Sequence, residues 1–382
     1  MVEIRQTPMG GDLKDFLDVV DTIYRDDPRY IRPLDMDLSD RLNPKKNPFF
    51  EHADGVIFTA YRSGKCVGRV TAQIDREHLA RHKDDVGFFG FLDTIDDEEV
   101  VKALLSKAEA WLKDRGMKTI RGPMSLSINE EIGCLVDGFE SPPVLLNPHH
   151  RPYQGSLIEK AGYQKAKDVW GWRYEVGEPN ARVKKAQEDI RAMPEVKIRR
   201  LSKANIDADV ATTLEIFNEA WNDNWGFVPA TPKEADKMAA DFKLFLVPDI
   251  TVLVEIDNKP AAVAIALPNV NELISDLHGK LWPFGLPKLL YRLKVEGAKS
   301  GRLILLGIKK EFRQNRKYAA LSLMLYAEMN DGGKKAGMTW GELGWTLEDN
   351  AAVNAGIRMM GAKKYKTYRV YEKSLSQGAN GA

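Results

Sequence analysis

The sequence predicts an α/β fold built from two tandem domains, and three observations support this. The chain has 382 residues, which is enough for two domains of ordinary size. One order of elements occurs twice along the chain, and each copy contains two neighbouring apolar runs separated by a short polar turn, which is typical of a β-hairpin. Apolar residues make up 43% and charged residues 29% of the chain, a composition that excludes a disordered protein.

The first copy begins with a short strand at 2–6 and a helical region. A hairpin is expected at 56–75, where a Ser-Gly-Lys turn joins two apolar runs. The segment 99–115 has apolar residues three and four positions apart, which predicts an amphipathic helix. The copy continues with a strand and a polar turn within 116–131. The end of a helix and a final strand follow within 159–176.

The second copy repeats this order with a strand at 196–200, a hairpin at 250–268, a helix at 320–336, a strand within 339–350 and a last strand within 358–373. Identity between the copies is low, so convergence on a common α/β pattern is the alternative to a duplication.

A polar segment with few large apolar residues separates the two copies, and it predicts a linker helix. We therefore expect domains at 1–178 and 195–375, a linker helix at 179–194, and a disordered tail at 376–382.

Several strings resemble a known family. They are NPFFEHADG (47–55), GPMSLSINEEIGCLVDGFESPP (122–143), FNEAWNDNWGF (217–227) and GKLWPFGLPKLL (279–290). In addition, Asn350 and Gly361 match the spacing of the last helix in the GNAT fold of acyl-CoA N-acyltransferases. The chain thus resembles a tandem GNAT-like family of the YghO type, to which a bacterial ceramide synthase is similar.

The resemblance implies two GNAT-like domains, each a mixed, mostly antiparallel sheet flanked by helices. It also implies transfer of an acyl group from acyl-CoA to an amine, with a long-chain amino alcohol as one acceptor. Ile357 stands where the family commonly has the tyrosine that acts as general acid, and Ala362 replaces a phenylalanine. These departures support an alternative function, that of a non-catalytic acyl-CoA or lipid-binding protein.

GNAT proteins bind the CoA pyrophosphate at a turn before a helix. Each half of this chain has one candidate turn, and the two differ in charge. The turn at 93–99 carries five acidic residues, whereas 309–320 has a net charge of +4. The resemblance therefore places acetyl-CoA or a longer acyl-CoA on the second domain, although Arg316 and Tyr318 occupy positions of the family's glycines. The expected contacts are Ile308, Lys309, Arg313, Arg316, Lys317, Tyr318, Ala319 and Asn350. A solvated basic loop is the alternative.

Acyl transfer needs a base for the amine proton and an acid for the leaving thiolate. Glu342 lies among apolar residues of a predicted strand, where a carboxylate can have a raised pKa, so it is the first candidate for the base. Glu348, at the end of the same segment, is a further catalytic candidate. Tyr326 is the nearest candidate for the acid, and His149 in the loop 136–153 is a second candidate for the base. The alternatives are a surface Glu342, a capping role for 348–350, a core Tyr326 and an exposed loop histidine.

A second set of residues is expected to contact the substrate because of its position in loops or aromatic clusters. The set comprises Asn129, Glu130, His150, Tyr153, Trp221, Trp225, Trp282, Phe284 and Trp345. For the aromatic members, packing in the core is the alternative.

Other features exclude several classes of function. His78 and His82 have helical spacing, but the HExxH pattern is absent, so no metal is expected. The net charge of +1 argues against a nucleic-acid partner. Cys66 and Cys134 are expected to be reduced thiols, and the N-terminus lacks the apolar segment of a secretory signal. We expect a cytoplasmic protein, in contact with the inner membrane through one segment.

That segment is the insertion at 271–300, which carries ten Leu, Ile, Phe or Trp residues and five basic residues against three acidic ones. Apolar residues combined with basic residues and a tryptophan are typical of a segment that contacts lipid, either an acyl chain or a bilayer surface. The alternative is a helix packed on the core with a basic rim.

Overall fold

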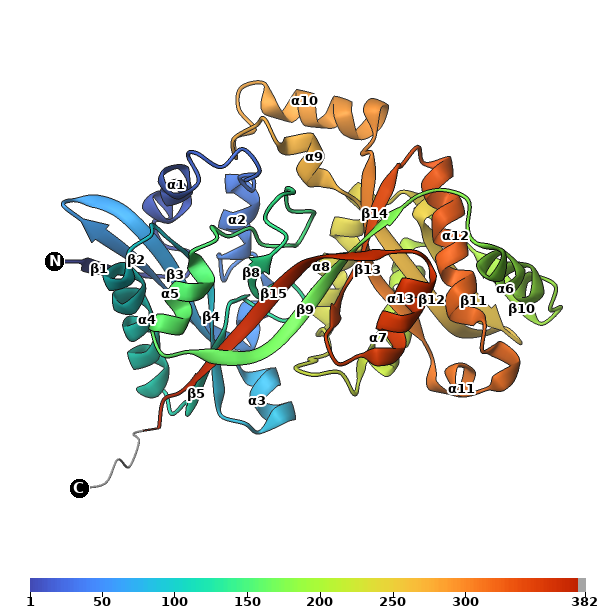
Figure 1. Cartoon of the computed structure of the whole chain (residues 1–382), viewed down its shortest axis with the longest axis horizontal. Coiled ribbons are helices and arrows are strands. Elements are labelled where there is room, and N and C mark those ends of the chain that lie inside the picture. The colour runs from blue at the N-terminus through green and yellow to red at the C-terminus, as the bar shows by residue number, and fades with distance from the viewer. Residues whose placement is uncertain (377–382) are drawn as a thin grey trace. The chain divides into compact units, whose positions relative to one another are not determined.

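The structure is a computed structural model that describes residues 1–376, apart from the side chain of Phe242 (Figure 1). The predicted disordered tail, beyond its first residue, lies outside the described part of the chain. The chain divides into two compact units. Unit 1 comprises Met1–Val169, Ile274–Leu281 and 366–376, and unit 2 comprises Trp170–Leu273 and Trp282–Tyr365.

Unit 1 contains the N-terminal helices and strands. Its elements are β1 (Glu3–Pro8), α1 (Lys14–Ile23), α2 (Asp35–Arg41), the 3₁₀ turn η1 (Pro48–Glu51), β2 (Ala53–Arg62), β3 (Lys65–Asp75), α3 (Arg76–His82), β4 (Val86–Thr94), α4 (Glu98–Lys113), β5 (Thr119–Gly122), β6 (Met124–Ser125), β7 (Glu131–Ile132), β8 (Cys134–Asp137) and α5 (Gln154–Lys160). The first half of β9 (Gln164–Glu175) and most of β15 (Lys363–Ser374) also belong to it.

The sheet of unit 1 has the order β1-β2-β3-β4-β5-β15. Adjacent strands of this sheet are antiparallel, except for β4 and β5, which are parallel. The helix α4 packs one apolar face on this sheet through Val100, Leu104 and Leu105, which are fully buried. The predicted mixed, mostly antiparallel sheet flanked by helices is therefore confirmed for this unit.

Unit 2 contains the remaining elements. They are α6 (Ala181–Arg191), β10 (Val196–Arg199), α7 (Ile206–Trp221), α8 (Pro232–Phe245), η2 (Pro248–Ile250), β11 (Thr251–Ile256), β12 (Lys259–Pro268), α9 (Val270–Ile274), α10 (Gly285–Tyr291), the π-helical turn η3 (Arg292–Glu296), β13 (Ser300–Ile308), α11 (Lys310–Arg313), η4 (Arg316–Tyr318), α12 (Leu321–Lys335), β14 (Trp340–Leu347) and α13 (Ala351–Met359).

Unit 2 repeats the sheet of unit 1. Its order is β14-β13-β12-β11-β10, and β13 and β14 form the parallel pair within otherwise antiparallel strands. Met324, Leu325 and Ala327 of α12 are buried in the core of this unit. The repeated order of elements predicted from the sequence is thus present in both units.

Both hairpins turn as the sequence predicts, and backbone geometry explains why. The β2–β3 turn places Ser63 and Gly64 at φ 52° and 77°, and the β11–β12 turn places Asp257 and Asn258 at φ 51° and 61°. Two consecutive positive φ values match a tight hairpin turn whose twist agrees with the strands. Gly, Asn and Asp tolerate this region of backbone space best.

The division into units differs from the domain boundaries expected from the sequence. The expected linker helix is α6, which lies within unit 2 with Val183 and Ile190 buried in its core. The last strand β15 pairs with β5 and β8 in unit 1 from Thr367 to Ser374. Each unit therefore contains strands from both halves of the sequence.

Candidate active site

In unit 2, the parallel strands β13 and β14 pair from Ser300 and Trp340 to Leu303 and Leu343. Beyond the last pair, two predicted substrate residues come together. The rings of Trp221 and Trp345 lie 6.2 Å apart, and the indole N–H of Trp221 donates to the carbonyl of Leu306 at 3.3 Å. The aromatic side chain of Phe217 on α7 packs against Trp221 at 5.1 Å. These side chains form an aromatic cluster next to the point where the pairing ends.

Glu342 lies on β14 and is completely buried. Its Oε1 is 3.3 Å from Nε of Arg302, and its Oε2 accepts a short hydrogen bond from the hydroxyl of Tyr365. Arg302 in turn donates to the carbonyl of Gly344 at 3.0 Å. Both carboxylate oxygens therefore have partners within the protein, an arrangement suited to holding β14 against its neighbours. The alternative of a surface Glu342 is wrong.

Tyr326 on α12 and Glu342 line the same cavity of about 50 Å³. Its other walls include Leu303, Met329 and Met338, so most of the lining is apolar. Burial raises the pKa of the Tyr326 phenol. The two predicted catalytic groups therefore line one cavity, although they lie on different elements. Their spacing in the sequence does not predict this arrangement.

The basic loop of unit 2 forms α11 and η4 before α12 begins. Lys309 pairs with Glu215, and Lys317 pairs with Glu195 at 2.5 Å. Arg313 and Arg316 are exposed. Of the other expected contacts, Ile308 and Tyr318 are buried and Ala319 is exposed.

The N-termini of α12 and α4 differ in their capping. Ala320 precedes α12 and has no side chain that caps the first-turn amides. At α4, by contrast, the Asp97 carboxylate accepts from the N–H groups of Glu99 and Val100. A ligand anion at α4 would have to displace this carboxylate, whereas α12 has no such competitor.

Asn350 and Glu348 lie at the start of α13. The Asn350 side chain accepts from the N–H of Val353 at 3.3 Å, so it caps the helix. The carbonyl of Glu348 is 3.4 Å from the Asn354 side-chain amide. The capping role that was the alternative for this segment is present for Asn350.

In unit 1, the loop residue His149 is buried, with 2% of its side chain exposed. Its Nε2 lies 2.9 Å from an Asp27 carboxylate oxygen, whereas its Nδ1 has no hydrogen-bond partner among residues 1–376. Burial lowers the pKa of His149, although hydrogen bonding to Asp27 opposes this shift. A neutral imidazole that donates from Nε2 to Asp27 keeps a lone pair on Nδ1, which is the requirement for a base. The alternative of a solvent-exposed histidine is wrong.

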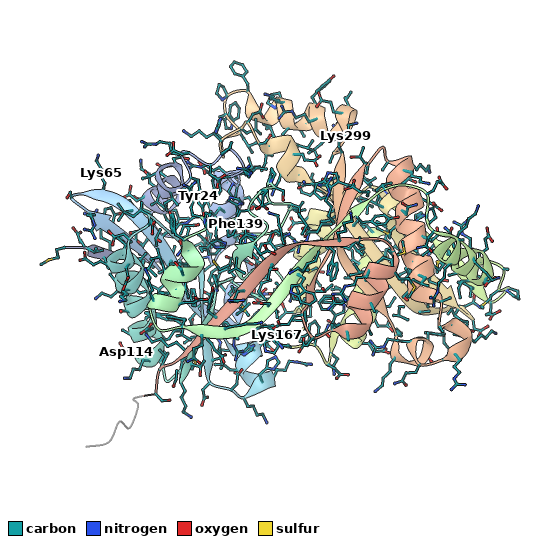
Figure 2. The ribbon with its side chains drawn as sticks, in the orientation of Figure 1. Tyr24, Lys65, Asp114, Phe139, Lys167 and Lys299 are labelled. Carbon is teal, nitrogen blue, oxygen red and sulfur yellow. The ribbon has the colours of Figure 1, made fainter. Side chains whose placement is uncertain are left out.

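A buried charged network surrounds this histidine. Arg69 of β3 pairs with Asp93 of β4 at 2.7 Å, and Tyr24 donates a short hydrogen bond to the same carboxylate. The Tyr24 hydroxyl also lies 2.9 Å from the carbonyl oxygen of His149, and its ring stacks on Tyr30 at 3.8 Å. Figure 2 labels Tyr24, which follows α1.

The residue pattern does not single out Asp27, Arg69 or Tyr24, and it groups Asp93 with the acidic turn before α4. In the structure, Asp93 is a buried residue of β4 that pairs with Arg69. An arginine inside an apolar strand was the available signal, because such a charge needs a buried partner.

The other predicted residues of unit 1 have structural partners. His150 accepts at Nδ1 from the N–H of Leu135 at 3.1 Å, and burial lowers its pKa to about 4. The Tyr153 hydroxyl donates to the carbonyl of Thr94 at 2.7 Å. Glu130 pairs with Arg41 at 2.7 Å. Asn129 is exposed.

The remaining predicted contacts belong to unit 2. Trp225 is half-buried, whereas Trp282 and Phe284 are 81% and 79% exposed.

Within residues 1–376, no cluster of three or more His, Cys, Asp or Glu side chains is arranged to hold a metal ion. The helices of the same part of the chain are all too short or too polar to cross a membrane.

Two curated proteins are similar to this chain over nearly its whole length. Protein YghO of Escherichia coli K12 is 38% identical over 367 residues, covering 96% of this chain and 93% of that protein. A bacterial ceramide synthase of Caulobacter vibrioides is 41% identical over 368 residues, covering 96% and 95%. No family model matches the chain.

Solved structures with low sequence identity share the fold. A tandem GNAT protein from the clavulanic acid biosynthesis pathway aligns with a TM-score of 0.57 at 13% identity, over 98% of this chain and all of that one. A GCN5-related N-acetyltransferase from Sphaerobacter thermophilus aligns with a TM-score of 0.52 at 13% identity, over 98% and 96%. The fold and the curated relatives together show that this chain belongs to the tandem GNAT-like family that includes YghO and bacterial ceramide synthase.

Proposed function

We propose that this protein is an acyl-CoA-dependent N-acyltransferase whose acceptor is a long-chain amino alcohol. The observation that carries the proposal is the 41% identity, over 96% of the chain, to a protein named bacterial ceramide synthase. A ceramide is the amide of a fatty acid with a long-chain amino alcohol, so the name specifies both the bond formed and the class of acceptor. The tandem GNAT fold supports acyl transfer as the reaction type.

In this reaction the amine nitrogen attacks the thioester carbonyl. The carbon–sulfur bond breaks, an amide bond forms, and CoA leaves as its thiol after it gains a proton. The ammonium form of the acceptor has no lone pair, so a base must accept a proton from it before or during the attack.

We place the CoA pyrophosphate at the start of α12 in unit 2. Arg313 and Arg316 are exposed there, and Ala320 offers no side chain that competes for the helix N-terminus. Guanidinium groups bind phosphate oxygens in pairs of hydrogen bonds, which compensates for the missing glycines. At α4, the four acidic residues of 96–99 include the Asp97 cap, so α4 is a poorer site.

Among the proton acceptors expected from the sequence, the geometry favours His149 over Glu342. The Nδ1 atom of His149 has no partner within residues 1–376, while both oxygens of Glu342 are engaged by Arg302 and Tyr365. A base needs a lone pair that no donor occupies, and Nδ1 of His149 offers one, whereas Arg302 and Tyr365 hold the Glu342 carboxylate in place.

The test is an assay of the purified protein with palmitoyl-CoA and a C18 2-amino alcohol. Release of CoA thiol and the mass of the amide product are measured together, with acetyl-CoA and octanoyl-CoA as donors of shorter chain length. Amide formation that requires both substrates is the expected result.

The same assay separates the alternative function. If palmitoyl-CoA raises the melting temperature but no amide forms with long-chain or short-chain amines, the protein binds acyl-CoA without catalysis. A ligand at 100 times its dissociation constant adds about 2.7 kcal/mol of stability, so binding is detectable without turnover.

A further inference from the structure

Exposed apolar side chains are concentrated in one segment of unit 2. Ten large apolar side chains are exposed among the described residues, and six of them lie within 282–295. They are Trp282, Phe284, Leu286, Leu290, Tyr291 and Val295. Monomeric proteins rarely leave a group of this kind in water, and such patches mark surfaces that bind lipid or protein.

The insertion at 271–300 is therefore two different parts. In its first part, Leu273 is buried in unit 2, and Ile274 and Leu277 are buried in unit 1. Its second part includes α10 and η3 and has one buried leucine, Leu289. The Arg292 guanidinium fixes this part within unit 2 by donating to the carbonyl of Leu273 at 2.7 Å. The core-packing alternative thus holds for residues 271–277 and fails for most of 282–295.

The exposed part is also basic. Residues 282–299 contain four basic residues and one acidic residue, and Lys288, Lys294 and Lys299 are all exposed. Figure 2 labels Lys299, where the segment joins β13. The cations thus accompany the aromatic side chains along the same short stretch of chain.

We propose that residues 282–299 form an interfacial segment that docks this protein on an anionic bilayer surface. The rings of Trp282 and Phe284 would enter the boundary between headgroups and acyl chains, where aromatic side chains are favoured. The lysines would remain with the anionic headgroups. α10 has seven residues, which is far too short to span a bilayer and suits attachment to its surface.

Charge complementarity decides between a bilayer and a protein partner. A protein interface concentrates its binding energy in a desolvated centre with few lysines. Here a short segment combines three exposed aromatic rings with three exposed lysines, as interfacial helices do.

The test is co-sedimentation of the full chain with vesicles in the absence of substrates. Binding is expected with vesicles of phosphatidylcholine containing 30% phosphatidylglycerol, and it should weaken with pure phosphatidylcholine and at high salt. Trp282→Ala with Phe284→Ala should weaken binding at least about tenfold. Lys294→Gln with Lys299→Gln should weaken it about 25-fold, at roughly fivefold for each charge.

Leu244 and Met36 supply a matched control, because both are exposed apolar residues outside the segment, at 71% and 61%. Leu244→Ser with Met36→Ser also removes two exposed apolar side chains and should leave vesicle binding unchanged. Equal binding by the wild type and the Trp282/Phe284 variant, or no binding to anionic vesicles, would overturn the proposal. So would self-association of the free protein that the Trp282/Phe284 variant abolishes, since a second copy would then be the partner.

Docking on a bilayer does not depend on the proposed acyl transfer. Vesicle binding is measured without acyl-CoA or amine, so its failure leaves the assay of amide formation unaffected. Conversely, a protein that binds vesicles but forms no amide would retain the docking surface and lose the enzyme function.

Discussion

A buried histidine with one ring nitrogen engaged and the other free is poised to accept a proton. In His149, Nε2 faces Asp27 while Nδ1 has no partner in the described part of the chain. His149→Gln keeps a donor near the position of Nε2 but removes the proton acceptor. We expect the rate of amide formation to fall about 10²–10⁴-fold, with a melting temperature within a few degrees of the wild type. Unchanged turnover would remove His149 from the chemistry.

Glu342 should behave in the opposite way. Glu342→Gln removes the negative charge beside buried Arg302 and alters the hydrogen bond with Tyr365. An uncompensated buried charge is costly, so the free energy of unfolding should fall by about 3 kcal/mol. Urea unfolding measures this loss. A stable variant with strongly reduced turnover would instead support Glu342 as the base.

His150 provides a test by pH. Its pKa is about 4 in the folded protein because of burial, whereas an unfolded histidine titrates near pH 6.5. Between these values the unfolded state binds the additional proton, so stability falls as the pH drops from about 6.5 towards 4. The loss attributable to this residue is about 3 kcal/mol.

The matched variant is His150→Asn, whose side-chain oxygen can still accept from the N–H of Leu135. Urea unfolding at pH 7, 5.5 and 4.5 should show a flatter dependence on pH in this variant. An identical pH dependence in both proteins would mean that the pKa of His150 is the same in the folded and unfolded states.

At the residue scale, the sequence identified the histidine but not its partners. His149 stood out because a paired histidine in a long loop is unusual, yet Asp27 lies 122 positions away and no local pattern connects the two. The same holds for Arg69 and Asp93, which face each other across neighbouring strands. Pairings of this kind depend on strand register, which residue spacing alone does not specify.

At the scale of elements, the start of α12 gives a prediction about the acyl donor. Arg313→Glu with Arg316→Glu reverses two exposed charges at the proposed pyrophosphate site. We expect the dissociation constant of CoA to rise at least about tenfold, because each reversal replaces an attraction for phosphate with a repulsion. Titration calorimetry with CoA measures the change.

The control for this variant is the acidic turn of unit 1. Asp96→Asn with Asp97→Asn neutralises two carboxylates there, and an asparagine at position 97 can still cap α4. CoA affinity should be unchanged. Weakening by the control and not by the arginine variant would move the donor site to unit 1.

Helices and strands were predictable from the sequence because their signals are local. Apolar spacing located α4 and α12, and polar turns located both hairpins. The insertion was harder, because an apolar residue on a helix is equally compatible with a core and with an exposed face. Leu289 is buried while its neighbour Leu290 is exposed, and only the three-dimensional packing distinguishes them.

At the scale of the whole molecule, the division of the chain shows what sequence order conceals. The boundary expected near 179–194 assumes that each domain is one continuous segment. The structure instead completes the sheet of unit 1 with the C-terminal strand, where Tyr371 pairs with Gly122 and Tyr368 pairs with Leu135. The side chains of a strand alternate between the two faces of the sheet whichever strand it pairs with. The sequence therefore predicts the strand but not its pairing partner.

Removal of this strand should therefore damage the N-terminal unit. Tyr371 is completely buried in the core of unit 1, and Tyr371→Ala should lower the free energy of unfolding by about 3–5 kcal/mol. Deletion of 366–382 should have a larger effect in the same place. Amide hydrogen exchange should accelerate in β5 and β8, at 119–122 and 134–137, before it accelerates in β11 and β12. Deletion of 377–382 alone is the control, because those residues lie beyond the last strand. If the chain folded as two continuous domains, Tyr371→Ala and the deletion of 366–382 would instead accelerate exchange within 195–365 and leave the N-terminal strands protected.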